Sequence, residues 1–215
     1  MKLIAIETST EICSIAYIDN RKCIDIVEDR IPRQHAEKLP LYYDKLVSNA
    51  GINLSVIDAI AISIGPGSFT GLRIGLSYAK GLAYSHKKPI VPVPTMQSLL
   101  YGSGIEVEDV AVVLHSHGNK YFVQKSNNRN GDSLRVTPHV SHIQVLTCES
   151  AADLGIDLSS VTIIHWNCEK LFDGLKNIRG IISVKPSAQL IGELAHQNYN
   201  EWVIKEPYKL VPDYV

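Results

Sequence analysis

The part of the sequence best suited to chemistry is the run Gly65–Gly75, which reads GPGSFTGLRIG. It directly follows the apolar segment 59–64, so the pattern predicts a strand that ends in a glycine-rich turn and leads into a helix. Backbone amides and the helix dipole at such a turn favour a bound anion. One hypothesis is therefore a nucleotide-binding loop that uses Gly65, Gly67 and Ser68.

Two common nucleotide motifs do not match this run. A P-loop needs a Lys after its second glycine, and the only basic residue near the turn is Arg73, inside the expected helix. A dinucleotide fingerprint needs Gly-x-Gly-x-x-Gly, whereas the step from Gly67 to Gly71 is one residue too long and no well-placed acid follows. The glycine spacing alone therefore does not establish a nucleotide site.

Helix packing is the other interpretation of the same residues. Gly71, Gly75, Ala79 and Ala83 recur every four residues, so they share one face of the expected helix and leave it almost without side chains. Another backbone can approach such a face closely. The pattern does not tell whether that backbone belongs to this chain or to a partner.

Composition indicates a globular protein and gives no sign of direct nucleic-acid binding. The chain has 215 residues, of which 45% are hydrophobic and 20% charged, enough for one or two domains. A net charge of -1 lacks the excess of Lys and Arg that phosphate binding needs, so we expect any RNA to be held through another protein.

The same composition suggests a compartment. Four scattered cysteines indicate reduced thiols, the chain start is too poor in apolar residues for a signal peptide, and no stretch reaches the roughly 18 apolar residues of a membrane span. We expect a cytoplasmic protein without a membrane partner.

The elements that would position the glycine-rich run form an α/β domain. Apolar alternation predicts a three-strand meander followed by strand–helix units. The expected strands are 2–7, 12–18, 22–27, 59–64 and 89–93, and the expected helices are 35–49, 70–86 and 95–101. We therefore expect mixed sheets flanked by helices.

A second lobe is expected to begin near residue 103. Its predicted strands are 110–114, 121–124 and 161–164, a polar loop is expected at 127–132, and a helix is expected at 187–199. The expected domains are 1–102 and 103–185, with part of the segment 186–215 completing the first. No pattern places the tail 206–212.

Four segments together resemble the bacterial TsaB family, also called YeaZ. They are 3–10 (LIAIETST), 35–40 (HAEKLP), 65–75 and 206–208 (EPY), in the family's order over nearly the whole chain. The resemblance implies a two-lobed actin-like, Hsp70-like ATPase (ASKHA) fold and a role in making threonylcarbamoyladenosine beside the tRNA anticodon. It also implies a subunit with no catalytic residue, which pairs with its catalytic paralogue TsaD, works with the ATPase TsaE and forms a homodimer when alone.

The resemblance also implies where a partner binds. In the family the first lobe packs against TsaD or a second copy, which points to the helices 35–49 and 70–86. The candidate residues are His35, Glu37, Leu39, Tyr42, Tyr43, Leu46, Thr70, Gly71, Arg73, Ile74, Gly75, Tyr78 and Ala79. The alternative is that these faces only build the chain's own core.

Residues that carry chemistry in relatives are altered here. The catalytic paralogue has two metal-binding His four apart where this chain has Thr95 and Leu99, and Leu offers no ligand atom, so we expect no bound metal. A Leu-Asp-Ala-Arg segment of the second lobe reads LHSH at 114–117. A metal site at His115 and His117 is one interpretation of that change, and ordinary turn histidines are the other.

A degenerate nucleotide loop is the remaining chemical candidate. Glu7, Thr8, Ser9 and Thr10 follow the first strand, where actin-like ATPases carry an acid, usually Asp in this family, and a glycine that this chain lacks. We expect no cofactor bound by this chain alone, while ATP or ADP at the interface with TsaD stays open. Two other functions also stay open: an active peptidase-like or phosphotransferase enzyme of the same fold, and a homodimeric binding module with another client.

Overall fold

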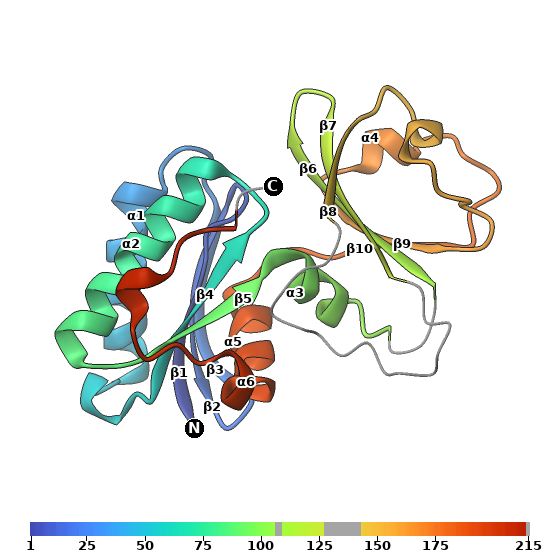
Figure 1. Ribbon diagram of the computed structural model, residues 1–215. Coiled ribbons are helices and arrows are strands. Elements are labelled where there is room, and N and C mark those ends of the chain that lie inside the picture. Colours follow the sequence, from blue (N-terminus) through green and yellow to red (C-terminus); the bar gives the residue numbers. More distant parts are fainter. Residues whose placement is uncertain (106–108, 127–142, 214–215) are drawn as a thin grey trace. The chain divides into compact units, whose positions relative to one another are not determined.

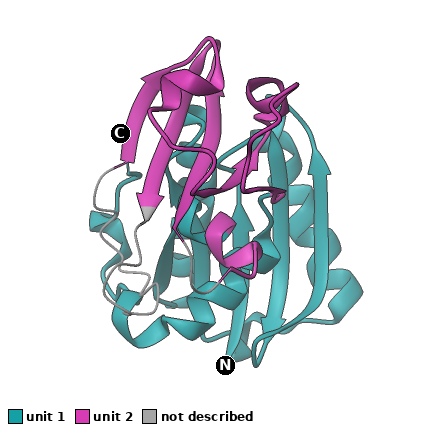
Figure 2. Cartoon of the chain, turned by 90° about the vertical axis from the view of Figure 1, so that its right-hand side faces the viewer, with its two compact units in different colours: residues 1–98, 186–214 teal, residues 99–185, 215 magenta. Residues whose placement is uncertain are grey.

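The computed structural model describes residues 1–105, 109–126 and 143–213 (Figure 1). It divides into two compact units: unit 1 holds residues 1–98 and 186–214, and unit 2 holds residues 99–185 and 215 (Figure 2). The first boundary lies inside helix α3 (Thr95–Gly102), a few residues before the position expected from the sequence. Each unit contains one five-stranded sheet.

Unit 1 contains a mixed sheet in the order β3-β2-β1-β4-β5. Its strands are β1 (Lys2–Glu7), β2 (Ile12–Asp19), β3 (Lys22–Arg30), β4 (Ala59–Gly65) and β5 (Ile90–Pro94). The first three form the antiparallel meander predicted from the sequence, and β4 and β5 run parallel to β1. β1 and β4 are buried along nearly their whole length, which explains their continuous apolar sequences.

Helices cover both faces of this sheet (Figure 1). One face carries α1 (His35–Ala50) and α2 (Phe69–His86), and the other carries α5 (Ala188–Gln197) and α6 (Tyr199–Trp202). Ile4 and Ile6 of β1 pack toward α1 and α2, whereas Ala5 and Ile18 lie against Gly192 of α5. The split follows from the alternation of side chains along a strand.

The C-terminal tail lies along unit 1 beside α2 (Figure 1). Ile204 forms a β-bridge with the start of β5. Further along, Lys80 Nζ donates a hydrogen bond to the carbonyl of Tyr208 at 3.2 Å, and the amide of Asp213 donates to the carbonyl of Ile64 at 2.7 Å. The tail therefore connects the outer strand β5, the helix α2 and the end of β4.

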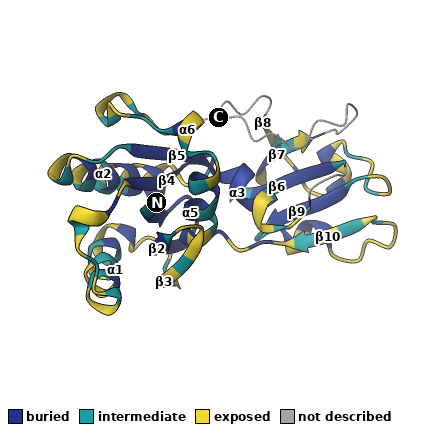
Figure 3. Ribbon diagram, turned by 90° about the horizontal axis from the view of Figure 1, so that it is seen from below, coloured by how far each residue is buried: buried dark blue, intermediate teal, exposed yellow. Residues whose placement is uncertain are grey.

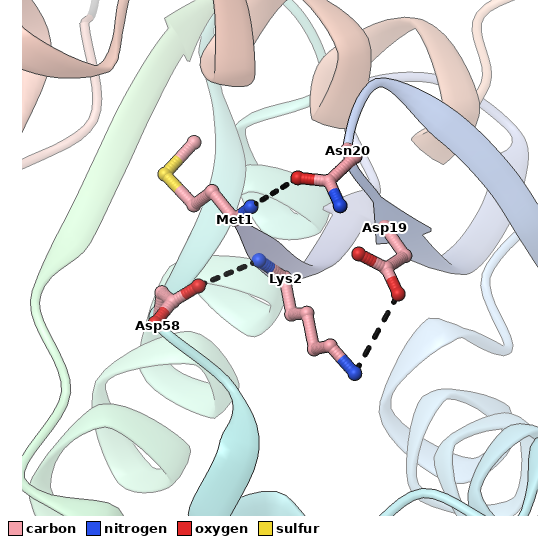
Figure 4. A network of polar contacts seen from close by, with 5 residues as sticks. All are labelled: Met1, Lys2, Asp19, Asn20 and Asp58. Carbon is pink, nitrogen blue, oxygen red and sulfur yellow. Dashed lines mark hydrogen bonds and ion pairs between the residues drawn. The ribbon is translucent and has the colours of Figure 1, made fainter.

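Polar contacts fix the amino-terminal end of β1, at the opposite end of the strand from Glu7 (Figure 4). The amino group of Met1 donates to Asn20 Oδ1 at 2.6 Å, and the amide of Lys2 donates to Asp58 Oδ2 at 2.6 Å. Lys2 Nζ also lies 3.5 Å from Asp19 Oδ2. These contacts join β1 to the segments on both sides of it.

Unit 2 contains a second mixed sheet, in the order β10-β9-β6-β7-β8. Its strands are β6 (Val110–His117), β7 (Lys120–Ser126), β8 (Ile143–Thr147), β9 (Thr162–Trp166) and β10 (Gly180–Ser183). Apolar side chains of β6, β7 and β9 pack against two short elements, η2 (Ala151–Leu154) and α4 (Glu169–Phe172). Figure 3 shows buried residues along the central strands of both sheets and exposed residues in the connections.

The differences from the sequence expectations have local causes. β3 is longer than predicted, and the short strands β8 and β10 were not predicted. The single helix expected over 187–199 is two helices, because the backbone of Asn198 leaves the helical conformation at φ -108° and ψ 18°. The loop expected at 127–132 lies outside the described residues.

Two further 3₁₀ turns are η1 (Leu54–Val56) and η3 (Pro207–Lys209). All four cysteines are free thiols, and Cys13, Cys148 and Cys168 are buried, as expected. Within the described ranges, no helix has the length and apolar character needed to cross a bilayer.

Candidate functional site

The glycine-rich run and the polar segment after the first strand meet at one edge of the unit 1 sheet. β1 and β4 are parallel neighbours, with Ile6 opposite Ile62, so their carboxyl ends lie side by side. The segment Glu7–Thr10 follows β1, and the run from Gly65 follows β4. In α/β sheets ligands bind at this edge, so it is the first place to look for chemistry.

The glycines of the run are packed against this segment of the same chain. A Cβ atom at Gly67 would overlap the carbonyl of Ser9, and one at Gly71 would overlap the carbonyl of Thr8. One at Gly75 would overlap the hydroxyl of Thr8. The glycines are therefore needed for close approach to Thr8 and Ser9 of the same chain.

Two amides at the start of α2 are also already paired. The amide of Ser68 donates to the carbonyl of Ser9 at 2.6 Å, and the amide of Gly71 donates to the Ser68 hydroxyl at 3.2 Å, which makes Ser68 the N-cap of the helix. A bound phosphate would have to displace both contacts. Gly65, Gly67 and Ser68, predicted as a nucleotide loop, thus form a turn in which the amides of Ser68 and Gly71 already have partners within the chain.

Glu7 is sealed beneath this turn. Its carboxyl is completely buried and accepts a hydrogen bond from the amide of Ser9, while Oε2 has no hydrogen bond among the described residues. Burial raises the pKa of Glu7 to about 6, and hydrogen bonds from Ser9 and Ser63 oppose part of that rise. A group with no exposed surface cannot touch a substrate, so this arrangement indicates a structural role. Thr8, Ser9 and Thr10 are buried as well.

The positions considered for metal chemistry are occupied by other interactions. Thr95 and Leu99 are fully buried in α3. His115 Nε2 lies 2.9 Å from the carbonyl of Gly118, and His117 Nδ1 lies 3.1 Å from the Ser116 hydroxyl, so both histidines contact their own turn. Within the part of the chain that the structure describes, no three His, Cys, Asp or Glu side chains come together as metal ligands.

A different feature of unit 1 is open to solvent: a groove of about 400 Å³ between α1 and α2. Its lining is mostly apolar and consists of Ala36, Leu39, Pro40, Arg73, Ile74, Ser77 and Tyr78. Tyr43 and Tyr78 join the two helices through an edge-to-face contact with centroids 5.9 Å apart. At one end, the Arg73 guanidinium lies 3.8 Å from the centroid of the Phe69 ring.

Comparison with known proteins decides the family. A family model described as tRNA N6-adenosine threonylcarbamoyltransferase (TsaD) matches residues 26–165. The tRNA threonylcarbamoyladenosine biosynthesis protein TsaB of Haemophilus influenzae is 30% identical over 207 residues, covering 93% of this chain and 86% of that protein. The chain belongs to the TsaB family. The TsaB protein of Escherichia coli K12 is 33% identical over 135 residues, covering 61% of this chain and 58% of that protein.

A solved structure from the TsaB family shares the fold. YeaZ from Pseudomonas aeruginosa superposes with a TM-score of 0.78 over 100% of this chain and 99% of that chain, at 23% identity. Together with two mixed sheets flanked by helices, this match confirms the actin-like fold that the sequence resemblance implied.

The TsaB resemblance also supplied the predicted partner residues, and several of them are unavailable to a partner. Gly71, Gly75 and Ala79 face the chain's own core, so the prediction that their bare face receives another protein is wrong. His35 and Leu46 are buried too, with His35 Nε2 3.2 Å from the carbonyl of Ile12. The physical reason is that a stripe of small residues permits close approach without specifying which backbone fills it.

The other predicted partner residues of this TsaB-family chain lie in or near the groove. Four line it: Leu39, which is fully buried in the groove floor, Arg73, Ile74 and Tyr78. The remaining four are Glu37 and Thr70, which are exposed, Tyr43, which packs on Tyr78, and Tyr42, whose hydroxyl donates to Asp29 at 2.8 Å.

Three groove residues were missed: Ala36, Pro40 and Ser77. Ala36 and Pro40 are four residues apart on α1, and Ser77 is four residues after Arg73 on α2. Helical periodicity could therefore have identified them. These three residues give little signal in the sequence, because none has a large apolar or a charged side chain.

Proposed function

We propose that this chain is a non-catalytic subunit that binds TsaD and supports threonylcarbamoyl transfer to the tRNA adenosine beside the anticodon. The groove between α1 and α2 is the proposed binding site for TsaD, and TsaE is the third protein of the proposed complex. The tRNA then contacts the complex rather than this chain. The match of the TsaD family model to residues 26–165 supports a paralogous relationship between the two partners.

The observation that carries this proposal is the closure of the strand-end site by the chain's own backbone. Gly67, Gly71 and Gly75 are pressed onto Thr8 and Ser9, and Glu7 beneath them is completely buried. A group-transfer enzyme needs reacting groups that a substrate can touch. The same closure argues against the peptidase-like and phosphotransferase alternatives.

A nucleotide shared with TsaD is a separate part of the proposal. It would need donors other than the amides of Ser68 and Gly71, which are already paired within the turn. We therefore place any ATP or ADP of the complex outside this turn.

The charges exposed on α1 and α2 support self-association of this chain in the absence of TsaD. α1 exposes Glu37, Asp44 and Lys45, and α2 exposes Arg73. In a twofold dimer the same patch meets itself, so α1 of one copy can pair with α2 of the other. We propose that this homodimer dissociates when TsaD binds the groove.

The test is the affinity of this chain for TsaD of the same organism, measured by sedimentation velocity with groove variants. Ala36→Arg and Ser77→Arg place a large cation on exposed groove positions and should weaken binding at least tenfold. Ser48→Arg is the matched control, because Ser48 is exposed on α1 but does not line the groove. The affinity of this variant for TsaD should be unchanged. No complex with the unaltered chain, or equal affinity of all variants, would refute the proposal.

A further inference from the structure

The exposed hydrophobic side chains of unit 1 are concentrated on α2 and the C-terminal tail. Among the described residues there are eleven exposed large hydrophobics, and four of them are Phe69, Tyr84, Tyr208 and Val211. Their exposed fractions are 52%, 87%, 68% and 68%. Two short segments thus carry more than a third of these exposed apolar side chains, a pattern typical of interaction sites.

Contacts and chain position place these residues along one surface. Lys80 Nζ donates to the carbonyl of Tyr208, and Tyr84 follows Lys80 one helical turn later. At the other end, Asp213 of the tail contacts Gly65 just before Phe69. Leu210, between these two anchor points, packs inward on the core. We name this surface, formed by Phe69, Lys80, Tyr84, Tyr208 and Val211, the strap face.

The two segments that contribute the strap face, α2 and tail residues 203–213, carry a net positive charge. α2 contains Arg73 and Lys80 and no Asp or Glu. The tail adds two Lys and two acids, and one of those acids, Glu206, lies 2.6 Å from Lys209. Four cations against two carboxylates favour a partner that offers carboxylates beside apolar side chains.

The groove alone is too small for a stable complex. It has seven lining residues, whereas standard interfaces contain about 20–30 residues on each side. Arg73 connects the two surfaces, because it lines the groove and stacks on Phe69 of the strap face. A partner seated in the groove can therefore extend over the strap face without a break.

We propose that the strap face is a second contact zone for the same partner, TsaD, and receives from it apolar side chains flanked by carboxylates. This inference rests on the proposed function, since it assumes that TsaD binds the adjacent groove. Tyr208 and Val211 supply the apolar contacts and Lys80 supplies the charge. The C-terminal tail is thus a binding element as well as a structural strap.

The experiment measures the affinity of the full-length chain for TsaD with strap-face variants at several salt concentrations. Tyr208→Ser combined with Val211→Ser should weaken binding about tenfold. Lys80→Glu should weaken it as much, and this loss should shrink as salt screens the new repulsion. Val145→Ser and Leu175→Ser are controls, because these residues are exposed hydrophobics of unit 2. Thermal melting of each variant confirms that it is folded.

Each outcome decides between the two proposals. Binding within about twofold of the unaltered chain for both strap-face variants would overturn this inference and leave the groove proposal intact. Loss of self-association with unchanged TsaD affinity would assign the strap face to a second copy and also overturn it. If the unaltered chain does not bind TsaD, the proposed function fails and this inference fails with it.

Discussion

The two units share one sheet design but differ in the helices that cover it. The order β3-β2-β1-β4-β5 of unit 1 and the order β8-β7-β6-β9-β10 of unit 2 are equivalent strand by strand. In both units, the first three strands along the chain form an antiparallel meander. The fourth and fifth strands run parallel to the first strand, which is β1 in unit 1 and β6 in unit 2. The connections before and after the fourth strand carry helices of 16 and 18 residues in unit 1, but only η2 and α4, of 4 residues each, in unit 2.

This difference indicates which parts of the fold are available to bind a partner. In unit 1, two long helices that lie side by side form the groove, and α2 also contributes to the strap face. In unit 2, the one-turn elements mainly cover their own sheet. The turn after the first strand differs as well: unit 1 buries Glu7 under glycines, and unit 2 has the partly exposed His115 in contact with its own turn.

The largest expected effect comes from filling the close contact of unit 1. Gly75→Leu forces a side chain into the Thr8 hydroxyl and Ile62, so we expect a loss of about 3 kcal/mol in the free energy of unfolding. Urea unfolding followed by the fluorescence of Trp202 in a Trp166→Phe protein measures it, because Trp202 is buried in unit 1.

A second glycine in the same helix is the control. Gly81 is exposed, and a Cβ added there would meet no atom within 4 Å, so Gly81→Ala should stabilise the protein by about 0.5–1 kcal/mol. A folded Gly75→Leu protein with normal stability would show that α2 does not pack on Thr8 as described.

The next effect concerns the buried acid of unit 1. Burial raises the pKa of Glu7 from its ordinary value of 4.5 to about 6, which corresponds to about 2 kcal/mol. The folded state binds the proton more tightly, so stability is highest below pH 4.5, falls as the pH rises to about 6 and stays reduced above it. Glu7→Gln should therefore be about 2 kcal/mol more stable than the unaltered protein at about pH 7 and equal to it at about pH 4.

Denaturant titrations of both proteins at the two pH values provide the measurement. Equal stabilities at the higher pH would mean that the carboxyl is hydrated or paired in solution, which would reopen the case for chemistry at this edge of the sheet.

A smaller effect of opposite sign is expected in unit 2. Burial lowers the pKa of His165, with Glu169 acting in the opposite direction, so the stability that His165 contributes is lost as the pH falls below its ordinary value of 6.5. A Trp202→Phe protein retains only Trp166 and reports on unit 2. Its melting temperature should fall between about pH 7 and pH 5, and His165→Gln in that protein should reduce the fall. An unchanged pH dependence would contradict the buried position of His165.

The sequence predicts the sheet of unit 1 well because β1, β2, β4 and β5 are mostly buried and apolar. It also predicts α1 and α2, whose periodicity places Leu39, Leu46 and Leu76 on one core. β8 and β10 are missed because they are short and largely exposed, so burial leaves little pattern in them.

The candidate site was less predictable for a different reason. The spacing of Gly71 and Gly75 correctly indicates close approach, but the approaching group is Thr8, more than 60 residues earlier in the chain. Such a pairing depends on the parallel alignment of β1 and β4, which no local pattern encodes. The tail was unplaced for the same reason, since its anchors at Ile64 and Lys80 are distant in sequence.

The most direct test of the central claim is tRNA threonylcarbamoylation by purified TsaD and TsaE of the same organism. The assay is run without this chain, with the unaltered chain and with Glu7→Gln. A non-catalytic subunit predicts little modification without the chain and full modification with either form of it. Full modification without the chain, or loss of modification with folded Glu7→Gln, would contradict the account.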